Sequence, residues 1–316
     1  MNNHPSDAPS TQNTAGRPVI ALLLLIAAPL LIGALLAPHA LQLLEWLSGH
    51  FNLGPHFTNP PFRRVLSRCV MISALIVLYP AIRLSGIRCW RDIGWAPIVE
   101  GRWRVIGGWF IAGAISMGIA YLLSDIFGAL YFRPRSTNLA TIAAQWTFRL
   151  AGALIIGVLE ETFFRGYLYS VLRRRMRLAG AVVLGGFLFA AIHFARPMEP
   201  AGFDPRHWAA GFHMLPHISD GIQPQYAAPM FVNLFLMGML LCLLYDCFGT
   251  VYAVIGLHAG WVWMQGIGTY MFDRDGTTLW ILFGPSETLS MTWAGTVMLV
   301  IFMAGALALH RDRENA

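Results

Sequence analysis

Long apolar runs separated by short polar segments recur along this 316-residue chain, and they limit its fold more than any other feature. A helix needs about 20 predominantly apolar residues to cross a bilayer. Eight runs are close to that length: 18–37, 65–83, 105–123, 150–172, 178–195, 230–247, 250–269 and 289–309. Charged residues make up only 12% of the chain, against about 25% in soluble domains. The sequence therefore predicts an all-α, polytopic transmembrane helix bundle with about eight spans.

The ends of the chain are polar. Residues 1–17 are of low complexity, and we expect them to form a disordered cytoplasmic tail. Residues 18–309 are expected to form a single membrane domain, and 310–316 a second cytoplasmic tail. The first apolar run is long for a signal peptide and follows a 17-residue tail, which favours a retained helix.

The basic residues indicate the orientation in the membrane. All 22 are arginines, and most lie beside apolar runs, so we expect no nucleic-acid partner. Cytoplasmic loops carry an excess of basic residues. With the N-terminus inside, the dense arginine clusters at 83–104 and 173–177 both lie inside. We expect an integral, multi-pass protein of the bacterial inner membrane, surrounded by lipid, with both termini cytoplasmic. The oligomeric state stays open.

Two adjacent glutamates, Glu160 and Glu161, interrupt the fourth run in "LEETFFRG". A charged side chain at the centre of a bilayer costs about 2.5–3.5 kcal/mol on insertion scales. Arg165 follows Glu161 by four residues, the spacing at which helical side chains meet, and follows Glu160 by five. We expect Arg165 to neutralise Glu161, and Glu160 to face the bundle interior as a free carboxylate. The alternative is a structural pair with both glutamates reaching the membrane surface.

Histidines end or interrupt two further runs. His193 lies in "FLFAAIHFA" on the same helix face as Phe189, which we expect to pack against it, and His258 lies in "IGLHAGWVW". Polar groups at membrane depth on three helices are expected to face one interior cavity. A glutamate and a histidine can activate water, and a second histidine can donate to an oxyanion. The pattern predicts hydrolysis of a peptide bond by Glu160, His193 and His258.

The same segments resemble a known family. "EETFFRG" matches EExxxR, "FAAIH" matches FxxxH, and His258 stands where a third helix supplies a histidine. In order and spacing the motifs are similar to the CAAX-processing and bacteriocin-processing (CPBP, or Abi) intramembrane endopeptidases, over roughly 90–270. The resemblance implies cleavage of a membrane-anchored or hydrophobic-tailed protein or peptide. It also implies that Glu160 polarises water with His193, and that His258 stabilises the oxyanion.

One position departs from that family's pattern. The last motif is usually HxxxN, but Val262 stands where the asparagine is expected. Asn233, on the sixth run, and Gln265, seven residues after His258, are the candidates to supply the missing amide. We favour Asn233.

A metal site is the alternative reading of the same residues. Glu160, His193 and His258 form a ligand set that suits zinc. The motif HExxH is absent, and a second base would be needed if Glu160 became a ligand. We therefore expect no cofactor, with zinc on these three side chains as the alternative.

Two other classes of function stay open at this point. Intramembrane glutamate and histidine can relay protons or bind cations in a transporter, although the paired, interrupted segments of an inverted repeat are absent from the sequence. A non-catalytic membrane partner or chaperone would not depend on Glu160 or His193 at all.

Overall fold

The computed structural model describes residues 17–51, 60–97, 101–274 and 292–314. These residues group into two compact units, one within 1–88 and 197–220, and the other within 89–196 and 221–316. The predicted membrane domain of 18–309 therefore contains two units. Most of the predicted tail 310–316 is helical, because the last helix continues to Glu314.

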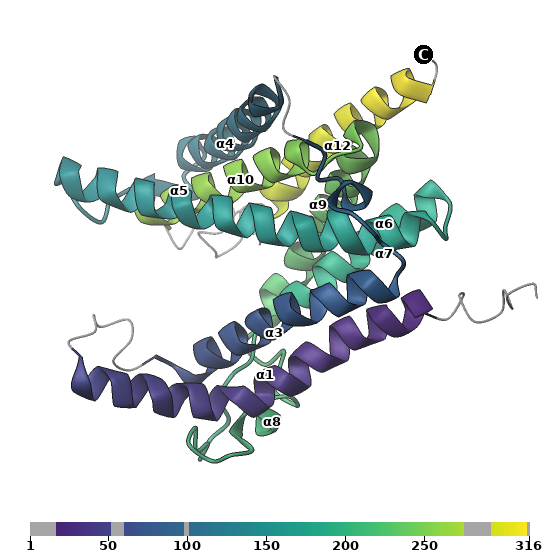
Figure 1. Ribbon diagram of the computed structural model, residues 1–316. Coiled ribbons are helices and arrows are strands. Elements are labelled where there is room, and N and C mark those ends of the chain that lie inside the picture. Colours follow the sequence, from purple (N-terminus) through teal and green to yellow (C-terminus); the bar gives the residue numbers. More distant parts are fainter. Residues whose placement is uncertain (1–16, 52–59, 98–100, 275–291, 315–316) are drawn as a thin grey trace, which may run out of the picture. The chain divides into compact units, whose positions relative to one another are not determined.

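The first unit consists mainly of two long helices, α1 (Arg17–His50) and α3 (Phe62–Leu84), which lie side by side in Figure 1. Gly33 permits the close approach, since a Cβ there would lie 2.5 Å from a methyl carbon of Val70. The short helix α8 (Ala210–His213) packs against α1. The helix α1 is much longer than the predicted run of 18–37, because it continues to His50.

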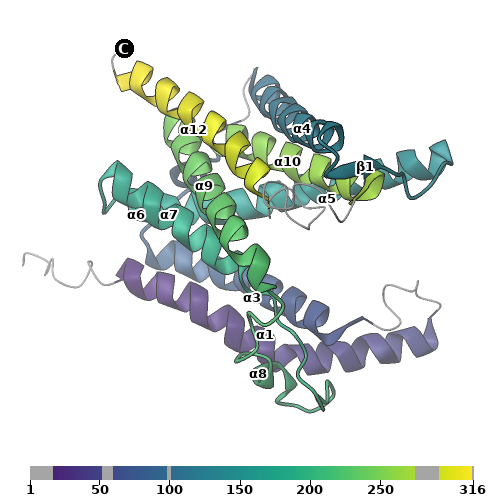
Figure 2. The same ribbon diagram turned by 180° about the vertical axis from the view of Figure 1, so that it is seen from behind.

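The second unit holds the other predicted runs. Its elements are η2 (Trp90–Ile93), α4 (Arg102–Ile126), β1 (Leu130–Phe132), α5 (Leu139–Glu161), η3 (Thr162–Tyr169), α6 (Ser170–Arg173), α7 (Leu178–His193), α9 (Pro224–Phe248), α10 (Tyr252–Met271), β2 (Phe272–Arg274) and α12 (Trp293–Glu314). The strands form one antiparallel pair with Leu130 opposite Arg274. Figure 2 shows α12 (yellow) beside α9 (green), and the two helices pack together.

The helix α10 forms the core of this unit because small residues let its neighbours approach. A Cβ at Gly256 would lie 2.3 Å from the Ile106 carbonyl oxygen of α4, and one at Gly260 would lie 2.2 Å from that of Phe110. Small residues at helix interfaces are typical of membrane bundles, where van der Waals packing drives association. His258 lies between these two glycines and is therefore carried into the interior.

The fourth predicted run is not a regular α-helix throughout. After α5, residues Thr162–Tyr169 form a π-helix, and α6 then completes a continuous helical segment, Leu139–Arg173. The hydroxyl of Ser170 donates to the Arg165 carbonyl at 3.2 Å, five residues earlier, as the wider turn allows. Short π-helical segments inside α-helices are frequently found at functional sites. This one begins directly after the paired glutamates.

The fold class is confirmed: within the described residues, all eight predicted runs overlap helices of an all-α, multi-pass bundle. Within the described residues, six helices are long and apolar enough to cross a membrane. The predicted fifth run, α7, has 16 residues, about 24 Å of helix, which is shorter than a bilayer core of about 30 Å. The seventh, α10, is not among the six, and it carries polar residues such as His258 and Gln265.

Candidate active site

A mostly apolar pocket of about 260 Å³ lies within the second unit. It is lined by residues of α4, α5, α7, α9, α10 and α12, together with Arg196 just after α7. The polar residues among them are Glu160, His193, Arg196, Asn233, His258 and Gln265. The structure therefore brings Glu160 and both predicted histidines to one cavity, together with both candidate amides.

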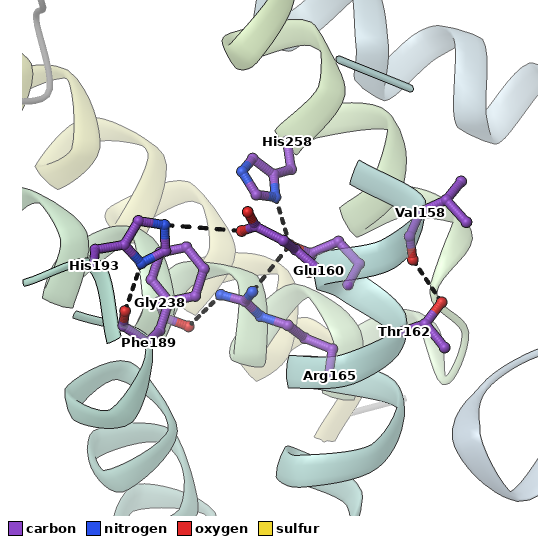
Figure 3. A network of polar contacts seen from close by, with 9 residues as sticks. Val158, Glu160, Thr162, Arg165, Phe189, His193, Gly238 and His258 are labelled. Carbon is purple, nitrogen blue, oxygen red and sulfur yellow. Dashed lines mark hydrogen bonds and ion pairs between the residues drawn. The ribbon is translucent and has the colours of Figure 1, made fainter. Parts of the chain in front are cut away.

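The buried centre beside this pocket is a carboxylate shared by two partners. Glu161 Oε1 accepts a hydrogen bond from Arg165 NH1 at 2.9 Å, so the predicted ion pair is present. The same oxygen lies 2.6 Å from His258 Nδ1 (Figure 3). Because a carboxylate only accepts, Nδ1 donates in this contact. Sequence analysis missed the contact, since 97 residues separate Glu161 from His258.

Arg165 has further contacts that hold it in place. Its NH2 group donates to the Gly238 carbonyl at 3.3 Å, and its guanidinium carbon lies 4.5 Å from the centre of the Phe189 ring. Gly238 is required there, since a Cβ would lie 2.7 Å from the Gly186 Cα of α7. Arg165 and Glu161 are both 0% exposed, so this pair is fully removed from solvent.

Glu160 and His193 face each other across the pocket. Glu160 Oε2 lies 3.9 Å from His193 Nε2, too far for a direct hydrogen bond. The other ring nitrogen, Nδ1, donates to the Phe189 carbonyl at 2.7 Å, because a carbonyl oxygen only accepts. In the neutral ring this fixes the tautomer and leaves Nε2 as an acceptor directed at Glu160. Figure 3 shows this orientation.

Phe189 packs against the catalytic candidates on two sides. Its ring lies 4.5 Å from that of His193 and 6.2 Å from that of His258, measured between centroids. The residue is fully buried. It therefore limits the positions that both imidazoles can adopt.

The two candidate amides have different surroundings. Asn233 is buried and joins α9 to the start of α12: its Nδ2 donates to the Thr292 carbonyl at 2.8 Å, and its Oδ1 accepts from Thr296 Oγ1 at 2.6 Å. Gln265 is half-buried in the pocket wall, beside Val262. Their roles as donors stay predictions.

The geometry around the histidines bears on metal binding. Among the described residues, no group of three or more His, Cys, Asp and Glu side chains is arranged to hold a metal ion. His258 uses Nδ1 for Glu161 and His193 uses Nδ1 for Phe189, so Nε2 is the nitrogen that each could offer. Zinc at this site stays an alternative prediction.

Comparison with known families agrees with this site. Residues 142–264 match the family model described as type II CAAX prenyl endopeptidase Rce1-like. The matched range contains Glu160, Glu161, Arg165, His193 and His258. A search of curated proteins finds no match to the chain. The family match favours hydrolysis over the transporter and chaperone alternatives. Over residues 142–264, this integral membrane protein is therefore similar to the Rce1-like type II CAAX prenyl endopeptidases, a family of hydrolases that act on peptide bonds.

Proposed function

We propose that the chain is an intramembrane endopeptidase that cleaves a membrane-associated or hydrophobic-tailed protein or peptide with water activated by Glu160 and His193. One observation carries the proposal: these two groups face each other at 3.9 Å in the wall of a mostly apolar pocket. Glu160 Oε2 has no hydrogen-bond partner within the residues that the structure describes. It is therefore available to a water or substrate.

The separation of the two groups suits a shared water. Two acceptors 3.9 Å apart can each accept one hydrogen of the same molecule at ordinary hydrogen-bond lengths. The water oxygen then attacks the scissile carbonyl carbon while Glu160 takes a proton. The same proton passes to the leaving amine nitrogen when the carbon–nitrogen bond breaks. His193 holds the water in line because Phe189 fixes its ring.

His258 is the candidate for stabilising the oxyanion. Its Nδ1 donates to Glu161, so Nε2 is the atom left to face the pocket. Donation from Nε2 requires a proton on both ring nitrogens. The positive charge of that ring lies beside the Glu161 carboxylate, which Arg165 also contacts. In this proposal Glu161 is a positioning residue that acts through His258.

The proposal is tested with the detergent-purified full chain and a peptide that carries a hydrophobic tail, with the products identified by mass spectrometry. We expect one cleavage site in the apolar part of the peptide.

We also propose a metal-free reaction, so chelators should leave the rate of cleavage unchanged, and elemental analysis should find well under one zinc per chain. Stoichiometric zinc that is lost together with activity in His193→Ala would contradict the metal-free mechanism. Accumulation of an intact substrate in a deletion strain, seen by terminal proteomics, would identify the natural target.

Asn233 is our candidate for the second oxyanion donor in place of the missing asparagine at Val262. Losing one donor lowers the rate by about 10²–10³-fold in a well-studied protease, so Asn233→Ala is expected to reduce kcat by at least tenfold. Thr296→Val is the matched control: it removes the hydrogen bond to Asn233 Oδ1 and keeps the amide.

Three outcomes separate the possible roles of these amides. If Thr296→Val is as damaging as Asn233→Ala, the connection between α9 and α12 matters rather than the donor. A silent Asn233→Ala together with a severe Gln265→Ala would place the donor on α10. Partial recovery of Asn233→Ala by a second change, Val262→Asn, would support our assignment.

We propose the orientation indicated by the arginine clusters, with both termini in the cytoplasm of a bacterial inner membrane. Reporters fused at the C-terminus and after Arg177 should then both read cytoplasmic, and one inserted near Gly211 should read external. If the reporters after Arg177 and near Gly211 read the same side, α7 does not cross the membrane in the proposed way.

A further inference from the structure

The end of η2 and the residues that follow it lie against the π-helix η3. Trp95 Nε1 donates to the Thr162 hydroxyl at 3.1 Å. That hydroxyl has one hydrogen, which it donates to the Val158 carbonyl at 2.6 Å, so its oxygen accepts from Trp95. Figure 3 shows Thr162 on the side of its helix that faces away from His193. A chain of three hydrogen-bonding groups therefore supports, from outside the pocket, the turn that carries Glu160.

The backbone that presents Trp95 is anchored on other helices. The Val251 N–H, just before α10, donates to the Gly94 carbonyl at 3.2 Å. Gly94 has a φ of +79°, and a Cβ there would lie 2.7 Å from the Tyr245 ring of α9. The Trp95 ring meets the Tyr252 ring edge to face, with 5.7 Å between their centroids. Trp95 is therefore held at a fixed place from which its N–H reaches η3.

A second contact holds the same segment against η3. A Cβ at Gly166 would lie 2.9 Å from the Ile93 carbonyl oxygen, so only glycine fits this approach without a shift. Ile93 itself is buried. Gly166 follows Thr162 by four residues, which is about one turn of helix. The segment therefore lies along a full turn of η3 and contacts it at both ends.

The width of η3 matters because it decides which of the two glutamates faces the pocket. A π-helical turn closes its hydrogen bonds one residue further along than an α-helical turn, and each residue of an α-helix turns the chain by about 100°. The extra residue in η3 therefore rotates Glu160 and Glu161 relative to the residues that follow. Those residues are fixed, since Arg165 donates to the Gly238 carbonyl. If η3 narrowed to a regular helix, Glu160 would turn out of its position opposite His193.

We infer that Trp95 is a positioning residue that, through Thr162, holds η3 in the register that directs Glu160 into the pocket. The inference rests on the proposed function for the role of Glu160. It adds a residue outside the pocket, since Trp95 is not among the lining residues that the structure describes. Because α-helical turns are far commoner than π-helical ones, contacts from outside are needed to keep η3 wide. Without the Trp95 N–H, the Thr162 hydroxyl keeps only its bond within the helix.

Kinetics on the detergent-purified full chain, with a peptide that carries a hydrophobic tail, test the inference. Trp95→Phe keeps an aromatic ring against Tyr252 but removes the N–H, and Thr162→Val keeps the shape but removes the hydroxyl. Loss of one hydrogen bond shifts an equilibrium by up to about tenfold, so kcat should fall by about that factor in either variant. KM should stay unchanged, because the apolar lining of the pocket is intact. Thr162→Ser keeps the hydroxyl and should keep the rate.

Carbodiimide labelling reports the register directly and does not require catalysis. Dicyclohexylcarbodiimide labels carboxyl groups that it can reach, and tandem mass spectrometry assigns the label to one glutamate or the other. In the wild-type chain Glu160, half-buried in the pocket, should be labelled far more than Glu161, which is fully buried. The ratio of the two labels should fall together with kcat in Trp95→Phe and Thr162→Val, and it should stay unchanged in Thr162→Ser.

Trp263→Phe is the matched control for Trp95→Phe. It removes an indole N–H that donates to the Trp146 carbonyl at 3.0 Å, between α10 and α5 of the same unit. It should leave the rate and the labelling ratio unchanged. The double variant Trp95→Phe/Thr162→Val should be no slower than Thr162→Val alone, since both changes remove the same contact. Thermal unfolding of each variant checks that the fold is kept.

Three outcomes decide between this inference and the proposed function on which it rests. An unchanged kcat and labelling ratio in Trp95→Phe would overturn the inference. Additive losses in the double variant, or an equal loss in Trp263→Phe, would overturn it too, because Trp95 would then act by general packing rather than through Thr162. A labelling ratio that depends on Trp95, in a chain that cleaves no hydrophobic-tailed peptide, would overturn the proposed function alone.

Discussion

Glu160→Gln is expected to abolish cleavage while the protein folds normally. Glutamine keeps the size of the side chain but cannot take a proton from water, and general-base catalysis is worth about 10²–10⁴-fold in rate. Glu160 lies half-buried in the pocket, opposite His193. Its substitution therefore leaves no buried cation without a counter-ion. The measurement is the initial rate of peptide cleavage, compared with protein abundance in the membrane and the unfolding temperature in detergent.

Glu199→Gln serves as the control for Glu160→Gln, since it changes an exposed glutamate far along the chain that accepts from the Arg63 N–H. It should leave the rate unchanged. A Glu160→Gln enzyme that retains a tenth or more of the wild-type rate would contradict the role of Glu160 as base. In that case water must be activated by another group of the pocket.

Glu161→Gln is expected to fail in a different way, by loss of stability as well as activity. The change leaves Arg165 as a buried cation without its carboxylate, and breaking a buried ion pair costs about 3–5 kcal/mol. It also removes the charged acceptor of His258 Nδ1. Unfolding temperature and membrane abundance should both fall, whereas Glu160→Gln should change neither. Equal loss of activity at normal abundance in both variants would contradict this division of labour.

A double variant separates the two roles of Glu161. Adding Arg165→Met to Glu161→Gln removes the stranded cation, and replacing both members of a buried pair by uncharged groups is often neutral or stabilising. Stability should therefore recover in large part. Activity should stay low, because His258 still lacks the carboxylate that orients it. Recovery of activity together with stability would show that Glu161 serves only to neutralise Arg165.

The comparison of sequence and structure is most instructive at the paired glutamates. The spacing of four residues predicts the contact of Glu161 with Arg165, and the structure has it at 2.9 Å. The prediction succeeds because neighbours on one helix are fixed by local geometry. The π-helix from Thr162 was not predicted, since apolar periodicity over so few residues does not distinguish a wider turn from a regular one.

Arg196 and Asn233 show where sequence reasoning reaches its limit. Arg196 carried the ordinary signal of a loop arginine beside an apolar run, and its one distinguishing feature was a spacing of three residues from His193. Asn233 was correctly placed on the sixth helix, but its hydrogen bonds to Thr292 and Thr296 join segments about 60 residues apart. Contacts of that kind depend on how helices pack, which no local pattern records.

The sequence by itself determined the membrane location, the helical class and the resemblance to a family of membrane endopeptidases. A chain so apolar has to satisfy its backbone hydrogen bonds within each segment, which in a bilayer favours helices, and the motifs around Glu160 and His193 have a fixed spacing. Only the tertiary structure decided which atoms of those motifs meet. Close approach at Gly256 and Gly260 seats α10 against α4, so that His258 reaches Glu161 rather than the lipid. That contact requires a close fit between two helix surfaces that are far apart in the chain. The fit is decided only when the helices pack, so neither local sequence records it.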